Sequence, residues 1–212
     1  MALELKTGTY GSYYTSSIDS SQSLSQSQME LNAAYICRYL LDRGWSTNAI
    51  AGLLGNMQHE SALNPGRWQS EDVGNLSGGY GLVQWTPASK YIDWVGNDTY
   101  NTMDNNLARI IYEVANNVQY YATDSYPETF KEFAVSEQDP YYLACAFAWN
   151  YERSYTVLYG TEEEKEALRQ KRGGSANEWY TFITGELPNI PVTPGKKNKK
   201  YKFILFNRKR WF

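Results

Sequence analysis

Glu60 lies where a helix could shield its carboxyl group from water. It comes seven residues after Leu53 and ten after Ile50, at the helical spacing of an apolar stripe, so it falls roughly on the buried face. Desolvation and the negative end of the helix dipole would both favour the protonated carboxyl group. A glycosidase needs such a group as its general acid. Periodicity alone also allows an exposed Glu60 at a frayed helix end.

The glycine-rich segment 67–85 has side chains that suit sugar binding. Gly81 would let the backbone approach a substrate closely. The amide of Gln84 offers a donor and an acceptor to N-acetyl or hydroxyl groups. Tyr80 and Trp85 offer flat faces for pyranose rings, although burial in the core of a small lobe is an alternative for Trp85.

These two regions resemble the motifs of known glycosidases. Gly55–Pro65 reads Gly-Asn-Met-Gln-His-Glu-Ser-Ala-Leu-Asn-Pro, and Gly79–Thr86 reads Gly-Tyr-Gly-Leu-Val-Gln-Trp-Thr. Together they resemble the Glu-Ser and Gly-Leu-x-Gln pair shared by goose-type lysozymes and lytic transglycosylases. The longer form, with Asn-Pro-Gly and Gln-Trp-Thr-Pro-Ala, is similar to the phage tail lysozyme family. The resemblance covers roughly residues 29–180.

The resemblance implies an enzyme that hydrolyses the β-1,4 bond between N-acetylmuramic acid and N-acetylglucosamine in peptidoglycan. It implies a location at the tail tip of a phage virion and a role in penetrating the wall of a Gram-positive host. Glu60 would be the catalytic acid, and no cofactor would be required. The implied substrate-binding residues in the two motifs are Ser61, Tyr80, Gly81, Gln84 and Trp85.

A third segment, 149–153, resembles the aromatic-Glu-Arg-Pro stretch found late in these domains. Ser154 stands where the family usually has proline. By the family pattern, Tyr151 and Glu152 border the substrate cleft. An ion pair of Glu152 with Arg153 or another arginine is an equal alternative.

The mechanism depends on a second carboxylate. Glu71 and Asp72 lie in the glycine-rich segment, where lysozymes often place the group that assists the transition state. We take Asp72 as the candidate, acting as nucleophile or activating water. Loop acids are commonly just solvated, and if neither reaches the cleft, Glu60 would act alone as acid and then base. An anhydro sugar product, the transglycosylase outcome, would then follow.

The cysteine and histidine content limits the other chemistries. Only Cys37, Cys145 and His59 are present, too few for the usual His/Cys zinc site, and no disulfide framework is indicated. A cysteine amidase would need one of these thiols beside His59. Both cysteines fall in apolar helical patterns, which indicates core positions instead.

Spacing and capping signals predict a mainly α (α+β), lysozyme-like fold with about seven helices and a small glycine-rich β-hairpin lobe. We expect an extended arm over residues 1–28, a catalytic domain over 29–186, and a proline-containing linker with a basic tail over 187–212. The predicted helix starts are Ser27 with Glu30, Ser46 or Thr47, Thr86-Pro87, Asp139-Pro140, Thr161 with Glu164, and Ser175 with Glu178.

Charge is distributed unevenly along the chain. The net charge is -3, yet residues 195–212 hold eight Lys or Arg and no acid, which leaves 12 basic against 23 acidic side chains elsewhere. We expect the basic tail, and the arm as well, to dock to other phage tail proteins. Anionic wall polymers, lipid headgroups and plain solvation are alternatives for the tail, whereas the acidic body disfavours nucleic acid.

The composition fits a folded globule, with 42% hydrophobic and 16% aromatic residues. No apolar run is long enough for a membrane span, and the first residues lack the charged-then-apolar signal pattern. If the protein acts outside the cell that made it, we expect it to leave by another route.

Overall fold

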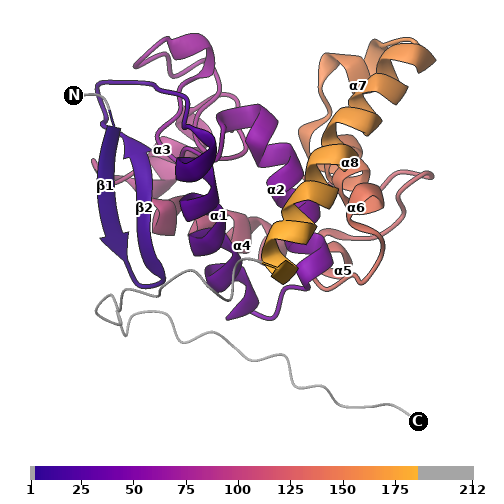
Figure 1. Ribbon diagram of the computed structural model, residues 1–212. Coiled ribbons are helices and arrows are strands. Elements are labelled where there is room, and N and C mark those ends of the chain that lie inside the picture. Colours follow the sequence, from indigo (N-terminus) through magenta and orange to yellow (C-terminus); the bar gives the residue numbers. More distant parts are fainter. Residues whose placement is uncertain (1–2, 186–212) are drawn as a thin grey trace.

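The computed structural model describes residues 3–185, which form eight α-helices and one two-stranded antiparallel sheet (Figure 1). The mainly α, lysozyme-like fold class is therefore confirmed. The strands are β1 (Leu3–Gly8) and β2 (Gly11–Ser16). The helices are α1 (Gln26–Leu41), α2 (Thr47–Ser61), α3 (Ser89–Val95), α4 (Met103–Asn116), α5 (Phe130–Ala134), α6 (Pro140–Phe147), α7 (Tyr155–Tyr159) and α8 (Glu162–Gly185).

Helix α2 is the centre of the fold and packs against α1, α6 and α8 (Figure 1). Two glycines allow the close approach. A Cβ atom on Gly52 would lie 2.9 Å from the Leu143 Cβ of α6, and one on Gly55 would lie 2.7 Å from the Arg172 carbonyl oxygen of α8. Helix α2 is therefore held tightly against α6 and α8.

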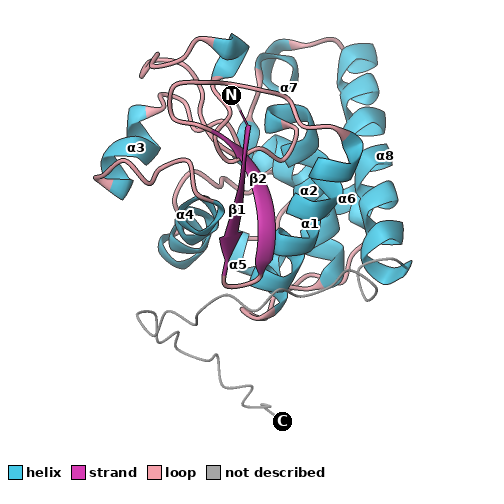
Figure 2. Ribbon diagram, turned by 60° about the vertical axis from the view of Figure 1, so that its left-hand side comes forward, coloured by secondary structure: helices cyan, strands magenta, loops and turns pink. Residues whose placement is uncertain are grey.

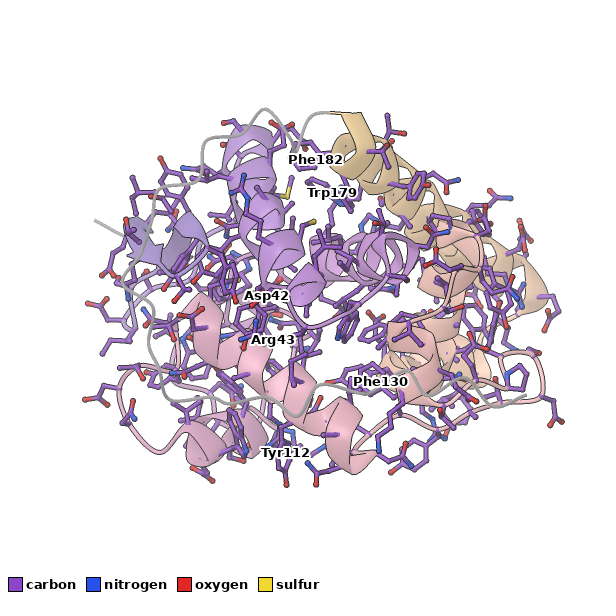
Figure 3. The ribbon with its side chains drawn as sticks, turned by 90° about the horizontal axis from the view of Figure 1, so that it is seen from below. Asp42, Arg43, Tyr112, Phe130, Trp179 and Phe182 are labelled. Carbon is purple, nitrogen blue, oxygen red and sulfur yellow. The ribbon has the colours of Figure 1, made fainter. Side chains whose placement is uncertain are left out.

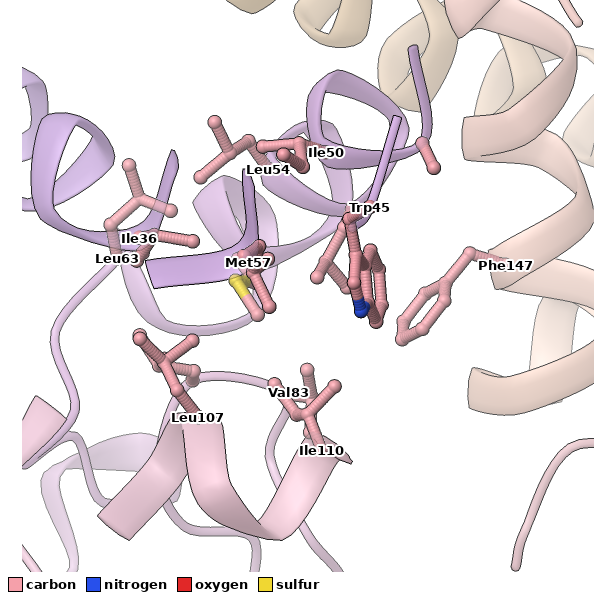
Figure 4. Packing of buried hydrophobic residues seen from close by; sticks show 14 of the residues in the cluster. Ile36, Trp45, Ile50, Leu54, Met57, Leu63, Val83, Leu107, Ile110 and Phe147 are labelled. Atoms are coloured by element: carbon pink, nitrogen blue, oxygen red, sulfur yellow. The ribbon is translucent and has the colours of Figure 1, made fainter. Parts of the chain in front are cut away.

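The apolar stripe of α2 forms the core, as its spacing predicts. Ile50, Leu54 and Met57 are fully buried, and Figure 4 shows Met57 between the other two and the α4 residues Leu107 and Ile110. In the C-terminal part of α8, Trp179 and Phe182 pack edge to face at 5.5 Å (Figure 3). The indole of Trp179 donates to Gln58 Oε1 of α2 at 2.7 Å, so α8 is attached to α2 both at its middle and in its C-terminal part.

Three predicted helix starts are confirmed. Ser46 caps α2 by accepting from the Ala49 amide at 3.0 Å. Asp139 caps α6, with Pro140 as its first residue. Thr161 accepts from the Glu164 amide at 3.2 Å at the start of α8.

Three other predicted starts are wrong. Helix α1 begins earlier, because Ser25 and Gln28 form the capping box instead of Ser27 and Glu30. Helix α3 begins at Ser89, after Thr86-Pro87. No helix starts at Ser175, whose hydroxyl bonds to His59 Nε2 at 2.9 Å, so α8 runs through it unbroken.

The sheet lies in residues 3–16, where the sequence indicated an arm, and not in the glycine-rich segment. The hairpin covers one side of the helical body next to α1 (Figure 2). The side-chain amide of Asn32 replaces a third strand: it accepts from the Tyr14 amide at 2.7 Å and donates to its carbonyl at 2.8 Å. Tyr13 packs edge to face on Tyr35 at 5.1 Å. Contacts with Asn32 and Tyr35 of α1 therefore hold the β1–β2 hairpin in place.

Segment 67–85 has a short 3-10 helix (Gln69–Glu71) and isolated bridges in place of the predicted hairpin. Trp68 and Trp85 each form a bridge to Tyr80. None of the described helices is long and apolar enough to cross a membrane. The predicted linker and basic tail, 187–212, lie outside the described residues.

Gly55→Ala should destabilise the protein, because the added methyl group would meet the backbone of Arg172 and Ala176 at 2.7 and 2.8 Å. Overpacking of this kind costs about 1–3 kcal/mol in the free energy of unfolding. Chemical denaturation of both proteins would measure the loss.

Gly174→Ala is the matched control, since it is also a helical glycine but has no heavy atom within 4 Å of the added Cβ. The better helix propensity of alanine should leave this variant as stable as the parent or up to about 1 kcal/mol more stable. A Gly55→Ala protein of unchanged stability would contradict the close contact of α2 with α8.

Candidate active site

A cleft of about 730 Å³ separates the glycine-rich segment from the C-terminal half of the domain. Glu60 lies in it at the end of α2. One wall comes from segment 67–90 and the other from the turn after α6. The lining residues include Arg67, Trp68, Gln69, Ser70, Val83, Gln84, Thr86 and Lys90 on the first wall, and Tyr151, Glu152, Arg153 and Ser154 on the second.

Glu60 occupies the last turn of α2, and its side chain is 23% exposed. The helix ends directly after it, because Ala62 adopts the left-handed conformation with φ of 53°. The carboxyl group accepts a hydrogen bond from Arg172 of α8. Glu60 is therefore half-sheltered at the cleft, neither frayed into solvent nor fully buried.

Arg172 is the residue that sequence reasoning missed. Its side chain is only 8% exposed, and its Nη1 donates to the Asn56 carbonyl at 2.9 Å. Its Nη2 donates to Glu60 and lies 3.2 Å from Glu152 Oε2. One signal could have found it: Arg172 precedes Ala176 and Trp179 at the i, i+4, i+7 spacing of a buried helix face.

Glu152 is more deeply buried than Glu60, with a side chain 7% exposed. Burial raises the pKa of Glu152 well above its usual range, and the charge of Glu60 raises it further, while Arg172 opposes both. Its Oε1 is buried and accepts no hydrogen bond. Within residues 3–185, no donor therefore offsets a negative charge on that oxygen.

Both sequence interpretations of Glu152 hold at once. It lines the cleft, as the family pattern implies, and it pairs with an arginine. The arginine is Arg172 of α8 and not the adjacent Arg153, whose guanidinium lies over the Tyr121 ring at 5.0 Å.

The structure does not bring Asp72 into the cleft. Asp72 is exposed, and its Oδ2 accepts from the Asn75 side chain at 2.9 Å within its own loop. The neighbouring Glu71 is also exposed and lies 3.4 Å from Arg67 in an ion pair. The carboxyl groups that line the cleft in the described chain are those of Glu60 and Glu152.

Several predicted sugar contacts lie beneath the wall of the cleft instead of on its surface. Tyr80 and Trp85 have no exposed surface, and Ser61 is buried. The Ser61 hydroxyl donates to the Leu82 carbonyl at 2.9 Å and thereby attaches α2 to the glycine-rich wall. These three residues shape the cleft without lining it.

Gly81 also serves packing more than substrate approach. Its φ is 79°, and an added Cβ would lie 2.6 Å from Asn106 Oδ1, which accepts from the Leu82 amide. Gln84 lines the cleft as predicted. Its amide nitrogen donates to the carbonyls of Gly81 and Arg67 at 3.0 and 3.2 Å, so it is partly used within the wall.

Of the remaining candidates, the two cysteines lie in the core and His59 is partly buried. Both cysteines are buried; burial raises the pKa of Cys145 to about 11 and that of Cys37 further still. Burial, with Arg172 and Lys171 nearby, lowers the pKa of His59 to about 4. This disfavours a cysteine–histidine amidase. Within residues 3–185, no three His, Cys, Asp or Glu side chains gather closely enough to hold a metal ion.

Comparison with known proteins places this geometry in a family. Over 165 residues the chain is 44% identical to a protein of Bacillus phage B103 named morphogenesis protein 1. That match takes in 77% of this chain and 42% of the relative, so the chain spans less than half the length of the curated relative it matches. Residues 31–183, more than half of the chain, match the phage tail lysozyme family. The chain therefore belongs to the phage tail lysozyme family.

Proposed function

We propose that the protein is a peptidoglycan glycosidase of a phage virion, cleaving the β-1,4 bond between N-acetylmuramic acid and N-acetylglucosamine. The observation that carries the proposal is the pair of carboxyl groups, Glu60 and Glu152, held at the cleft by Arg172. A glycosidase needs a carboxyl group that keeps its proton near neutral pH.

The pair supplies this proton because two carboxyl groups face one guanidinium. If both were ionised, one negative charge would stay uncompensated where Glu152 is almost completely buried. A single proton shared by the pair removes that charge. Glu60 is the more exposed partner and delivers the proton to the leaving oxygen.

The walls suit an N-acetylated glycan. The exposed Tyr121 lines the cleft with aromatic surface, Gln84 lines it with an amide, and Trp68 lies almost completely buried in its wall. Lys90 and Arg153 add positive charge at the cleft, which suits the carboxylates of peptidoglycan stem peptides better than a neutral glycan.

A lytic transglycosylase is the second candidate, favoured by the place of the carboxyl groups. Glu60 and Glu152 lie at the same guanidinium nitrogen, too close together for a water molecule to act between them as in inverting enzymes. The lining residues of segment 67–90 include no acid. With no second carboxylate on that wall, Glu60 would act as acid and then base, and the product would be an anhydro sugar.

The phage context comes from the family and from the name of the relative. We infer a virion component that acts at the tail tip during wall penetration, with docking to other tail proteins through the N-terminal residues and the basic tail. A catalytically silent tail module would not need a buried pair of acids at its cleft, so we favour an enzyme.

Glu60→Gln should lower the rate of saccharide release from Gram-positive peptidoglycan about 100-fold or more, because it removes the proton donor. Mass spectrometry of the released fragments measures both rate and product. Reducing-end saccharides from the parent protein indicate a hydrolase, and anhydro sugars indicate a transglycosylase.

Two matched variants control this test. Glu163→Gln changes an exposed glutamate of α8, and Asp72→Asn changes the acid outside the cleft; both should retain parental activity. Undiminished release by Glu60→Gln, or release of free peptides alone, would refute the proposal.

The activity should fall as pH rises through the raised pKa of Glu152, because the pair then loses its proton. In Glu152→Gln the charge of Arg172 faces a single carboxyl group and stabilises its ionised form. The alkaline limb of the kcat/KM profile should therefore move to lower pH by about one unit or more. An alkaline limb that stays in place, as it should for Glu163→Gln, would exclude a shared proton.

A further inference from the structure

A carboxyl group on α4, that of Glu113, lies directly behind the cleft with no exposed surface. Its Oε1 accepts from the indole of Trp85 at 3.0 Å and from Nε of Arg109 at 2.8 Å. Its Oε2 accepts from the hydroxyl group of Tyr151. Three donors therefore converge on one buried carboxylate that does not line the cleft.

These donors come from different parts of the cleft. Trp85 directly follows Gln84 on the glycine-rich wall, and Tyr151 directly precedes Glu152 on the opposite wall. Arg109 lines the cleft itself. The carboxylate of Glu113 is thus bonded to both walls at positions next to their functional side chains.

The rings of Trp85 and Tyr151 are each stacked on another aromatic ring. Trp85 stacks on Tyr91 at 4.5 Å with an interplanar angle of 10°. Tyr151 stacks on Phe147 at 4.5 Å with an angle of 21°. Both stacked rings donate to the same carboxyl group, so Glu113 connects the two wall segments.

Three donors, one of them a guanidinium, face the Glu113 carboxyl group. Burial raises the pKa of Glu113, and the donors Tyr151, Arg109 and Trp85 counter it. Losing the carboxylate would leave three buried donors without their acceptor, which the surrounding structure can satisfy only by moving.

We propose that Glu113 is a positioning residue that fixes the spacing of Gln84 and Glu152 across the cleft. It acts through Trp85 and Tyr151 and touches no substrate. The inference rests on the proposed glycosidase function and adds a residue to it.

Two substitutions test the network with little change in volume. Tyr151→Phe deletes one hydrogen bond and should lower kcat about 10-fold. Glu113→Gln lets its amide oxygen accept from Trp85 and its amide nitrogen donate to Tyr151, but removes the charge facing Arg109. It should lower kcat about 10- to 100-fold, since small displacements of reacting groups have effects of that order.

The double variant should be little slower than Glu113→Gln alone, because both changes disrupt one network. Values of kcat and KM are measured well below the unfolding temperature of each variant, on peptidoglycan fragments. A purely structural role would lower the unfolding temperature and leave kcat unchanged.

Tyr35→Phe is the matched control. It also deletes a hydrogen bond from a buried tyrosine to a carboxylate, that of Asp104 at 2.7 Å, and neither residue lines the cleft. This variant should lose stability and keep the parental kcat. Parental kcat in Glu113→Gln and Tyr151→Phe, or an equal fall in Tyr35→Phe, would overturn the inference.

Failure of the proposed glycosidase function can be distinguished from failure of the positioning role of Glu113. If the parent protein releases no saccharide, the glycosidase proposal fails, and the positioning inference is decided by binding of N-acetylchitohexaose. Isothermal titration calorimetry measures this binding. Weaker binding by Glu113→Gln but not by Tyr35→Phe supports the inference, and equal binding by all three proteins overturns it.

Discussion

The arrangement of the helices around the cleft depends on the contact of Arg172 with the carboxyl groups of Glu60 and Glu152. A buried guanidinium is costly unless its charge is matched, and here the Asn56 carbonyl and two carboxyl groups face its Nη1 and Nη2 atoms, whereas Nε has no partner among the described residues. The match requires α8 to lie against the last two turns of α2. Gly55 permits that approach, since any side chain there would meet the backbone of α8. The packing of two helices thus determines the chemistry at the cleft.

The two carboxyl groups differ because their surroundings differ. Glu60 lies at a helix end with part of its surface in water, whereas Glu152 lies in a π-helical turn, Ala148–Glu152, with almost none. Burial disfavours the negative charge of Glu152 and raises the pKa of this carboxyl group. The basic partner of both groups, Arg172, comes from α8. The charge balance of the site therefore depends on tertiary contacts.

The opposite wall shows the same division between surface and support. Gln84 meets the cleft, while Ser61, Tyr80 and Trp85 lie behind it and hold the loop in place. A segment rich in glycine has little preference for one conformation. Its shape comes from buried rings and from the side chains of Asn106 and Glu113 of α4.

The sequence by itself determined the central helix, its apolar stripe and the place of Glu60 at its end, because helical periodicity and capping are local properties. Motif resemblance indicated the family and the cleft residues Gln84, Tyr151 and Glu152. Only the tertiary structure decided that Arg172 joins Glu60 to Glu152, that Asp72 stays outside the cleft, and that residues 3–16 form the sheet. Each of these depends on contacts between residues far apart in the chain, such as Asn32 with Tyr14 or Asn56 with Arg172. Local patterns carry no information about such distant partners.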